Sequence, residues 1–140
     1  FQAADKANLH KQAQRVQAAL QRVLKHYPLE EVSGHFHDTY GQALANTLAA
    51  LQAGVTSVDS SAGGLGGCPY AESATGNLAT EDLVYLFEGM GVTTGVDLEA
   101  LAEAGVFMSE ALGRTLPGRF HQAWRGERER AACRIPLAAT

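Results

Sequence analysis

The chain has 140 residues, of which 46% are hydrophobic and 19% charged, and its formal net charge is −4. This length suits one ordinary domain, and the composition is that of a globular protein rather than a disordered one. The acidic balance and the lack of a lysine and arginine cluster argue against a nucleic-acid partner. No apolar run reaches membrane-spanning length. Two cysteines, Cys68 and Cys133, are too few for a disulfide framework and favour a reducing compartment.

A long helix is predicted at the start of the chain, over residues 1–28. Apolar residues from Leu9 to Tyr27 recur at alternating steps of four and three, which is the spacing of one helical face. Lysine, arginine and glutamine occupy the other faces, and Pro28 ends the pattern. We expect this amphipathic helix to pack along its apolar side.

Two short strands separated by a helix are predicted next. Residues 32–37 and 55–60 are extended in character and bounded by turn residues. Between them, Thr39 and Gln42 have the spacing of a capping box, so we expect them to start a helix that Gly54 stops. The apolar stripe of this helix is formed by Leu44, Leu48 and Leu51.

A third helix is predicted to follow a glycine-rich loop. It begins near Thr80, and Glu81 and Asp82 occupy its first turn, where the helix dipole favours acidic side chains. Its end is expected at Gly89 or Gly91. The side that we expect to be buried carries Leu83, Phe87 and Met90.

Asp97 is predicted to cap a further helix, and from residue 115 the pattern fades into a polar tail that we expect to be loose. One face of this helix carries Leu98, Leu101, Gly105, Met108 and Leu112. The order of strand, helix, strand, loop and helices is typical of an α/β fold with a parallel sheet covered by helices. Ligands of such folds gather at the carboxyl ends of the strands.

His35 and His37 are the first candidate site residues. Because side chains two apart on a strand point to one face, the two Cα atoms would lie about 6.6 Å apart, and one metal ion can accept both rings. A pair of inward-facing histidines with hydrogen bonds to their neighbours has the same spacing, so both interpretations stay open. Asp38 and Asp59 would either support the histidine rings or simply end the strands.

Four glycines lie directly before Cys68. Glycine reaches backbone conformations that other residues avoid, so this stretch predicts a mobile loop that carries a thiol. A free thiol, with a pKa of about 8.5, is mostly protonated at neutral pH and can donate a proton to an enolate. Near a positive centre it would instead be a thiolate nucleophile. A phosphate-binding loop is disfavoured, because no Gly-Lys-Ser/Thr follows. The four residues are Gly63, Gly64, Gly66 and Gly67.

Together, these residues resemble a known family. The succession of residues 35–46, 58–61, 63–71 and 76–82 resembles the 3-hydroxy-3-methylglutaryl-coenzyme A lyases, and the resemblance is close over residues 29–114. The glycine–cysteine loop is specific to the lyases. The His-x-His and Gly-Asn elements are shared with a broader superfamily of metal-dependent barrels, which includes isopropylmalate and homocitrate synthases.

The resemblance implies an α/β fold that is the C-terminal part of a (β/α)8 TIM barrel, preceded by a long N-terminal helix. Residues 1–140 would form one partial barrel region, with a helical segment over 1–28, a lyase-like part over 29–114 and a loose tail over 115–140. A complete barrel runs to about 250 residues, and the family's Arg-Asp pair and Asp-Thr-Ile-Gly strand have no counterpart here. Because unpaired sheet edges would be exposed, we expect a homo-oligomer or pairing with the missing N-terminal half.

The resemblance also implies the chemistry, which is metal-dependent retro-Claisen cleavage of 3-hydroxy-3-methylglutaryl-coenzyme A to acetyl-coenzyme A and acetoacetate. His35, His37 and Asn77 would ligate a divalent cation, Mg²⁺ or Mn²⁺. Cys68 would protonate the enolate, and Glu81 matches an acidic position near the site, so His35, Cys68 and Glu81 are the candidate catalytic residues. The four glycines would form the lid, and the supporting residues would be Asp38 and Tyr40.

The resemblance implies an acyl-coenzyme A substrate as the partner, and neither nucleic acid nor a membrane. The expected location is the cytoplasm of a bacterium or the mitochondrial matrix. Two alternatives remain, a synthase that runs the Claisen condensation forward and a non-catalytic barrel fragment. Because the Arg-Asp pair is absent, we expect weak metal binding and little lyase turnover from the isolated chain.

Overall fold

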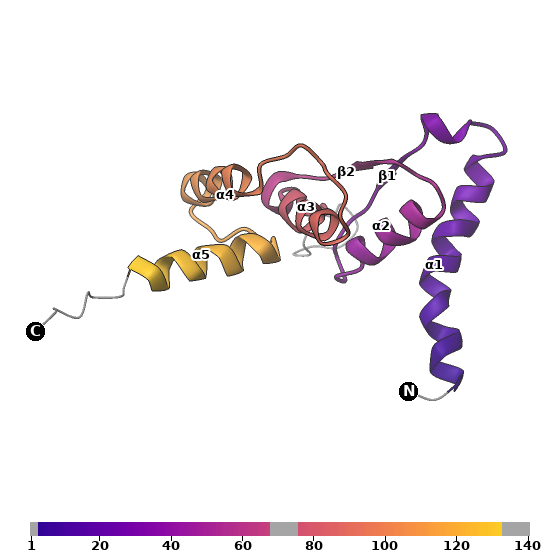
Figure 1. Ribbon diagram of the computed structural model, residues 1–140, viewed down its shortest axis with the longest axis horizontal. Helices are drawn as coiled ribbons and strands as arrows, with labels where there is room; N and C mark the ends of the chain where they lie inside the picture. The colour runs from indigo at the N-terminus through magenta and orange to yellow at the C-terminus, as the bar shows by residue number, and fades with distance from the viewer. Residues whose placement is uncertain (1–2, 68–75, 133–140) are drawn as a thin grey trace, which may run out of the picture. The chain divides into compact units, whose positions relative to one another are not determined.

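The computed structural model describes residues 3–67 and 76–132 (Figure 1). The chain divides into two compact units. The first unit comprises Phe1–Ser60 and Gly66–Leu78, and the second comprises Ser61–Leu65 and Ala79–Thr140. The glycine-rich stretch is therefore shared between the two units.

The first unit contains a two-stranded parallel sheet and two helices. Its elements are α1 (Ala3–Val23), the 3-10 turn η1 (Leu29–Glu31), β1 (Ser33–His35), α2 (Ala43–Gln52) and β2 (Ser57–Asp59). Strands β1 and β2 pair in parallel, with Ser33 opposite Ser57 and His35 opposite Asp59 (Figure 1). This confirms the predicted parallel pairing, although both strands are shorter than the segments 32–37 and 55–60.

A small core joins α1 to α2 and the strands. Leu20 of α1 packs against Ala50 of α2 and Val55, and all three side chains are buried. Half-buried apolar side chains surround them, namely Val16, Leu24, Leu29, Val32, Phe36 and Ala53. The middle of the predicted apolar side is therefore the part that packs. Val23 and Tyr27, expected on the same side, are 40% and 58% exposed, and α1 ends at Val23 rather than at Pro28.

The start of α2 differs from the prediction. No side chain caps this helix at Gln42, so the expected capping box of Thr39 and Gln42 is wrong. A turn with Gly41 at φ +69° lies between the strand and the helix, and the carboxylate of Asp38 accepts a hydrogen bond from the Ala43 amide at 2.9 Å. The fully buried side chains of α2 are small ones rather than the leucines, namely Ala43, Thr47, Ala49 and Ala50.

The end of α2 is as predicted. Gly54 has φ +97° and donates to the Leu51 carbonyl at 2.9 Å, while Val55 donates to the Ala50 carbonyl at 3.0 Å. This pair of hydrogen bonds is the Schellman motif, in which the residue after the helix takes a left-handed conformation that suits glycine. It leads the chain directly into β2.

The second unit is helical. Its elements are the 3-10 turn η2 (Ala62–Gly64), α3 (Thr80–Gly89), α4 (Leu98–Leu112) and α5 (Arg119–Ala132), and α3 contacts the other three (Figure 1). The predicted start of α3 at Thr80 is confirmed. The carboxylate of Asp97 caps α4 as predicted, by accepting from the Ala100 amide at 3.0 Å. Met90 and Leu112, expected on buried faces, are each 46% exposed.

Helix α5 corrects the expectation of a loose tail from residue 115. Asp82 of α3 accepts hydrogen bonds from the amides of Arg119 and Phe120, at 3.1 and 2.7 Å. A carboxylate at this place satisfies free amides of the first turn and interacts favourably with the helix dipole. Further along, Arg125 donates to the Ser109 hydroxyl of α4 at 3.4 Å. None of the helices within residues 3–67 and 76–132 has the length and apolar character needed to cross a membrane.

Substituting Gly105 by alanine should destabilise the second unit. A Cβ atom at Gly105 of α4 would lie 2.6 Å from Nδ1 of His121. We expect Gly105→Ala to lower the free energy of unfolding by about 1–3 kcal/mol, as overpacked cores do. Denaturant titration measures this change.

The control for Gly105→Ala is Gly126→Ala in α5. A Cβ atom there meets only the end of Arg130 at 3.8 Å, so the better helix propensity of alanine should raise stability by about 0.5–1 kcal/mol. Equal effects of the two substitutions would contradict the close approach of His121 to α4.

Candidate functional site

The two predicted histidines lie together at the end of β1. The ring centroids of His35 and His37 are 5.3 Å apart, and the ring planes are tilted by 57°. Two imidazoles on one ion, with metal–nitrogen bonds of about 2.1 Å and a tetrahedral angle, would have centroids about 5 Å apart. The spacing of the two rings is therefore compatible with a shared divalent cation.

A carboxylate from the neighbouring strand lies beside the first of these rings. Oδ2 of Asp59 is 3.6 Å from Nδ1 of His35, and the two residues are opposite each other in the parallel register. Oδ1 of the same side chain accepts from the Ser33 hydroxyl at 3.2 Å. An acidic partner at Nδ1 orients a histidine ring and leaves Nε2 available to a ligand.

Asn77 is brought to the histidines by backbone pairing. Asn77 forms an isolated antiparallel bridge with His37. On either side of it, the Leu78 amide donates to the Phe36 carbonyl at 3.1 Å and the Asp38 amide donates to the Gly76 carbonyl at 2.8 Å. Residues 76–78 thus lie alongside residues 36–38, which joins the histidines to a residue 40 positions further along the chain.

The donor set at this place contains two imidazoles and one amide. Within residues 3–67 and 76–132, no three His, Cys, Asp or Glu side chains gather closely enough to hold a metal ion. An amide oxygen is nevertheless a suitable ligand for hard cations. The side chains of His35, His37 and Asn77 are thus of types that a divalent cation accepts, and the backbone bridge places Asn77 next to His37.

A close contact between two glycines holds Asn77 in its place. A Cβ atom at Gly76 would lie only 2.1 Å from the carbonyl oxygen of Gly66, and one at Gly66 would lie 2.7 Å from Nδ2 of Asn77. Gly66 also has φ +116°, a conformation that side chains disfavour. The backbones at these two positions can approach each other only because both residues lack a side chain.

The other predicted site residues of the first unit have different surroundings. Tyr40 is 85% exposed, and Asp38 uses one carboxylate oxygen to hold the start of α2. Gly66 and Gly67 are exposed. Cys68, predicted as the proton donor, lies outside the described residues.

Glu81 has a different environment from the one that its position suggests. The side chain is 0% exposed, and its two carboxylate oxygens accept from the Gly63 amide at 2.9 and 2.8 Å. Burial raises the pKa of Glu81 from 4.5, and this effect outweighs the hydrogen bonds, which lower it. Glu81 therefore lies in the first turn of α3, as predicted, but its carboxylate is buried and holds the Gly63 amide of η2.

The first half of the predicted lid is consequently fixed. Gly63 and Gly64 are buried within η2, and Gly63 also accepts a hydrogen bond from the Gly118 amide at 3.3 Å. These two residues belong to the second unit, whereas Gly66 and Gly67 belong to the first. Any lid movement would therefore involve the later glycines rather than all four.

A parallel sheet flanked by helices, with a His-x-His pair at the carboxyl end of a strand, is the arrangement of the metal-dependent barrels. The chain belongs to the HMGL-like family, whose pattern matches residues 5–108. Among its relatives, mitochondrial hydroxymethylglutaryl-CoA lyase of Homo sapiens is 60% identical over 104 residues, which are 74% of this chain and 32% of the human protein. The cytoplasmic 3-hydroxy-3-methylglutaryl-CoA lyase of Rattus norvegicus is 54% identical over 104 residues, 74% of this chain and 30% of the rat protein.

Solved structures agree with this family. The hydroxymethylglutaryl-CoA lyase of Pseudomonas aeruginosa has a TM-score of 0.79 and 46% identity, covering 82% of this chain and 38% of that one. An HMG-CoA lyase of Acinetobacter baumannii, solved with coenzyme A and 3-methylmalate, has a TM-score of 0.70 and 34% identity over 91% of this chain and 39% of that one. The chain spans about one third of the length of the curated relatives it matches.

Substituting Gly76 by alanine should disturb the candidate metal site. Because the added Cβ atom would overlap the backbone of Gly66, we expect Gly76→Ala to lower the free energy of unfolding by about 1–3 kcal/mol. It should also weaken Mn²⁺ binding, measured by calorimetry. The control is Gly67→Ala, since a Cβ atom there meets nothing within 4 Å. Unchanged Mn²⁺ binding by folded Gly76→Ala would contradict this account of the site.

The buried carboxyl of Glu81 predicts a pH dependence of stability. Because the pKa of Glu81 is raised in the folded state, the folded protein binds this proton more tightly than the unfolded chain. The free energy of unfolding should therefore fall as pH rises above about 4.5, the unfolded value. Glu81→Gln should remove this part of the slope in urea titrations at a series of pH values.

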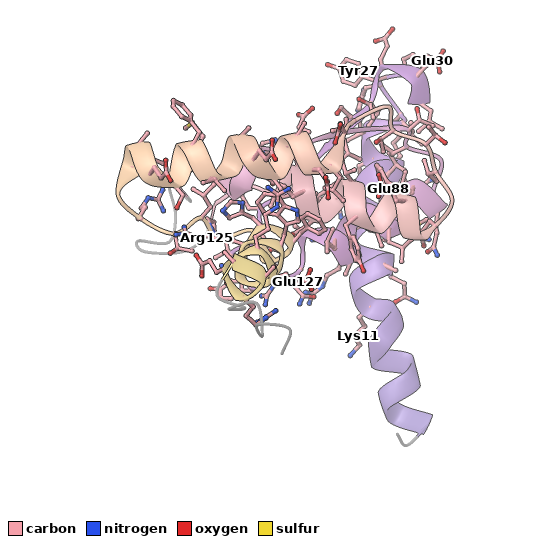
Figure 2. The ribbon with its side chains drawn as sticks, turned by 60° about the vertical axis from the view of Figure 1, so that its left-hand side comes forward. Lys11, Tyr27, Glu30, Glu88, Arg125 and Glu127 are labelled. Atoms are coloured by element: carbon pink, nitrogen blue, oxygen red, sulfur yellow. The ribbon has the colours of Figure 1, made fainter. Side chains whose placement is uncertain are left out.

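The control for Glu81→Gln is Glu88→Gln, an exposed position on the same helix (Figure 2). It should leave the dependence of stability on pH as it is in the wild-type protein. If Glu81→Gln and wild-type protein lost stability in parallel above pH 4.5, the raised pKa of Glu81 would be wrong.

Proposed function

We propose that the chain forms the C-terminal part of a lyase that cleaves 3-hydroxy-3-methylglutaryl-coenzyme A into acetyl-coenzyme A and acetoacetate. The observation that carries this proposal is the backbone pairing of residues 76–78 with residues 36–38, which brings Asn77 beside His37. The centroid distance of 5.3 Å between His35 and His37 supports it. So does the 60% identity to the human lyase over 104 residues.

Three side chains would hold the cation. The hydroxymethylglutaryl-CoA lyases are metal-dependent in general, and we propose His35, His37 and Asn77 as ligands. A mixed set of imidazole and oxygen donors suits Mn²⁺ or Mg²⁺. When bound, such a cation polarises the oxygens of the substrate and lowers the barrier to enolate formation.

The protein's own groups would orient these ligands. Asp59, 3.6 Å from Nδ1 of His35, would fix the ring with Nε2 directed to the ion. The contact between Gly66 and Gly76 would keep the Asn77 backbone against His37. Asp38 would contribute by fixing the start of α2, and the exposed ring of Tyr40 would be available to substrate.

The thiol of Cys68 would complete the reaction. Cleavage of the carbon–carbon bond leaves an enolate, and a protonated thiol can deliver a proton to its carbon atom. Gly66 and Gly67 would give the backbone before Cys68 the freedom to bring the thiol to the substrate and withdraw it. We assign Glu81 an indirect role, because its carboxylate binds Gly63 rather than facing solvent.

The substrate class and compartment follow from the same proposal. An acyl-coenzyme A is the expected substrate, and one similar structure was solved with coenzyme A bound. Residues equivalent to the rest of the barrel would supply the missing Arg-Asp pair, either in the same polypeptide or in a partner. Relatives are named mitochondrial and cytoplasmic, so either compartment suits the chain.

A chimera tests the proposal most directly. We would join this chain to the N-terminal part of the Pseudomonas aeruginosa lyase that it lacks, and measure acetoacetate release from 3-hydroxy-3-methylglutaryl-coenzyme A. The chimera should be active with Mn²⁺ or Mg²⁺, whereas the 140-residue chain alone should show little turnover. In the chimera, Cys68→Ala should lower kcat by about 10²–10⁴-fold, the usual contribution of a general acid.

The matched control is Cys133→Ala, which removes the second thiol and should leave kcat unchanged. A folded chimera that binds Mn²⁺ but releases no acetoacetate would overturn the proposed activity. Equal activity of the Cys68→Ala and parent chimeras would overturn the role of the thiol while leaving the activity in place.

A further inference from the structure

Ser33 of β1 donates to the carboxylate that lies beside His35. Its hydroxyl oxygen is 3.2 Å from Oδ1 of Asp59 and 3.3 Å from the carbonyl oxygen of Ser57, both on β2. A serine hydroxyl carries a single hydrogen, and a hydrogen bond to a charged acceptor is about twice as strong as one to a neutral acceptor. The bond to Asp59 is therefore the favoured one.

The other oxygen of this carboxylate faces the imidazole. Oδ2 of Asp59 lies 3.6 Å from Nδ1 of His35. This contact is slightly longer than a hydrogen bond, and contacts of this kind often shorten when a site binds its ligand. Since Ser33 donates to Oδ1, Oδ2 is the oxygen that is available to His35. Asp59 thus connects the hydroxyl to the ring.

Strand pairing brings the three side chains to one face of the sheet. In the parallel register Ser33 is opposite Ser57, and His35 is opposite Asp59. Side chains two apart on a strand share a face, and Ser33 and His35 are exposed whereas Gly34 between them is buried. The side chains of Ser33, Asp59 and His35 therefore lie on the face that is turned away from the core of the first unit.

A carboxylate beside Nδ1 influences where a neutral histidine ring keeps its hydrogen. Neutral imidazole has its hydrogen on one nitrogen, and the other nitrogen is an acceptor or a metal ligand. Asp59 favours the form of His35 with the hydrogen on Nδ1, which leaves the electron pair of Nε2 free. The bond from Ser33 restricts the rotamers open to Asp59 and so keeps its carboxylate beside the ring.

We propose that Ser33 is a positioning residue, which holds Asp59 against His35 and so keeps the ring in the form whose Nε2 can bind a cation. The use of Nε2 for a cation rests on the proposed function, whereas the link from Ser33 to the ring does not. In a purely structural role the hydroxyl would only join β1 to β2 through the Ser57 carbonyl. Such a role would leave the form of the ring unchanged.

NMR of the 140-residue chain, labelled with ¹⁵N and free of metal, tests the proposal. The shifts of the two ring nitrogens of His35 give the ratio of its Nδ1–H form to its Nε2–H form, at about pH 9, where an ordinary imidazole is neutral. In Ser33→Ala this ratio should fall about two- to threefold, the lower end of what one hydrogen bond contributes, because the side chains are open to water. Ser33→Thr keeps the hydroxyl and should restore the wild-type ratio.

The matched control is Ser57→Ala, which removes the hydroxyl opposite Ser33 and keeps the carbonyl that Ser33 contacts. It should leave the ratio at His35 as it is in the wild-type protein. An equal ratio in wild-type and Ser33→Ala protein would overturn the proposal, as would an equal fall in Ser57→Ala. Because Ser33 is exposed, its truncation leaves no buried cavity and the variant should fold.

Calorimetry with Mn²⁺ separates this inference from the proposed function. Ser33→Ala should bind Mn²⁺ about two- to threefold more weakly than the wild-type protein, for the same loss of one hydrogen bond. If the ratio at His35 changes as expected and neither protein binds Mn²⁺, the role of Ser33 stands and the cation site is wrong. If both proteins bind Mn²⁺ equally and the ratio does not change, the cation site stands and the role of Ser33 is wrong.

Discussion

A single buried carboxylate determines how the glycine-rich stretch is held. Both oxygens of Glu81 accept from the Gly63 amide, in a place that water does not reach. A charged acceptor makes such a bond strong, and burial leaves the amide without an alternative partner. The helical unit is built around the same side chain, because α4 approaches it at Gly105 and α5 contributes the ring of His121. In this way η2 becomes a fixed part of the second unit.

Features of the fold that depend on neighbours in the sequence could be predicted from it. The end of α2 at Gly54 and the cap of α4 at Asp97 each involve residues a few positions apart. Helix α5 was missed because few of its residues are apolar, and because its first turn is held by Asp82, 37 positions before Arg119. A capping box at Thr39 was wrong because Gly41 introduces a turn that its spacing does not reveal.

The candidate site also combines local features, which the sequence predicts, with contacts between distant residues, which it does not. The spacing of His35 and His37 predicted that their rings lie together, since it requires only the alternation of a strand. The contact of Asp59 with His35 depends on the register of two strands, and sequence reasoning left its role open. His121 was overlooked as part of a polar tail. The contact that buries its ring is with Gly105 of α4, 16 positions earlier in the chain, so no neighbouring residue indicates it.

The position of the glycines also restricts which residues this region can accept. A side chain at Gly63 would overlap that of Leu116 within the second unit, and one at Gly76 would overlap the backbone of Gly66 within the first. Related chains should therefore keep glycine at both positions, and should vary more readily at Gly89, where a side chain would meet nothing within 4 Å.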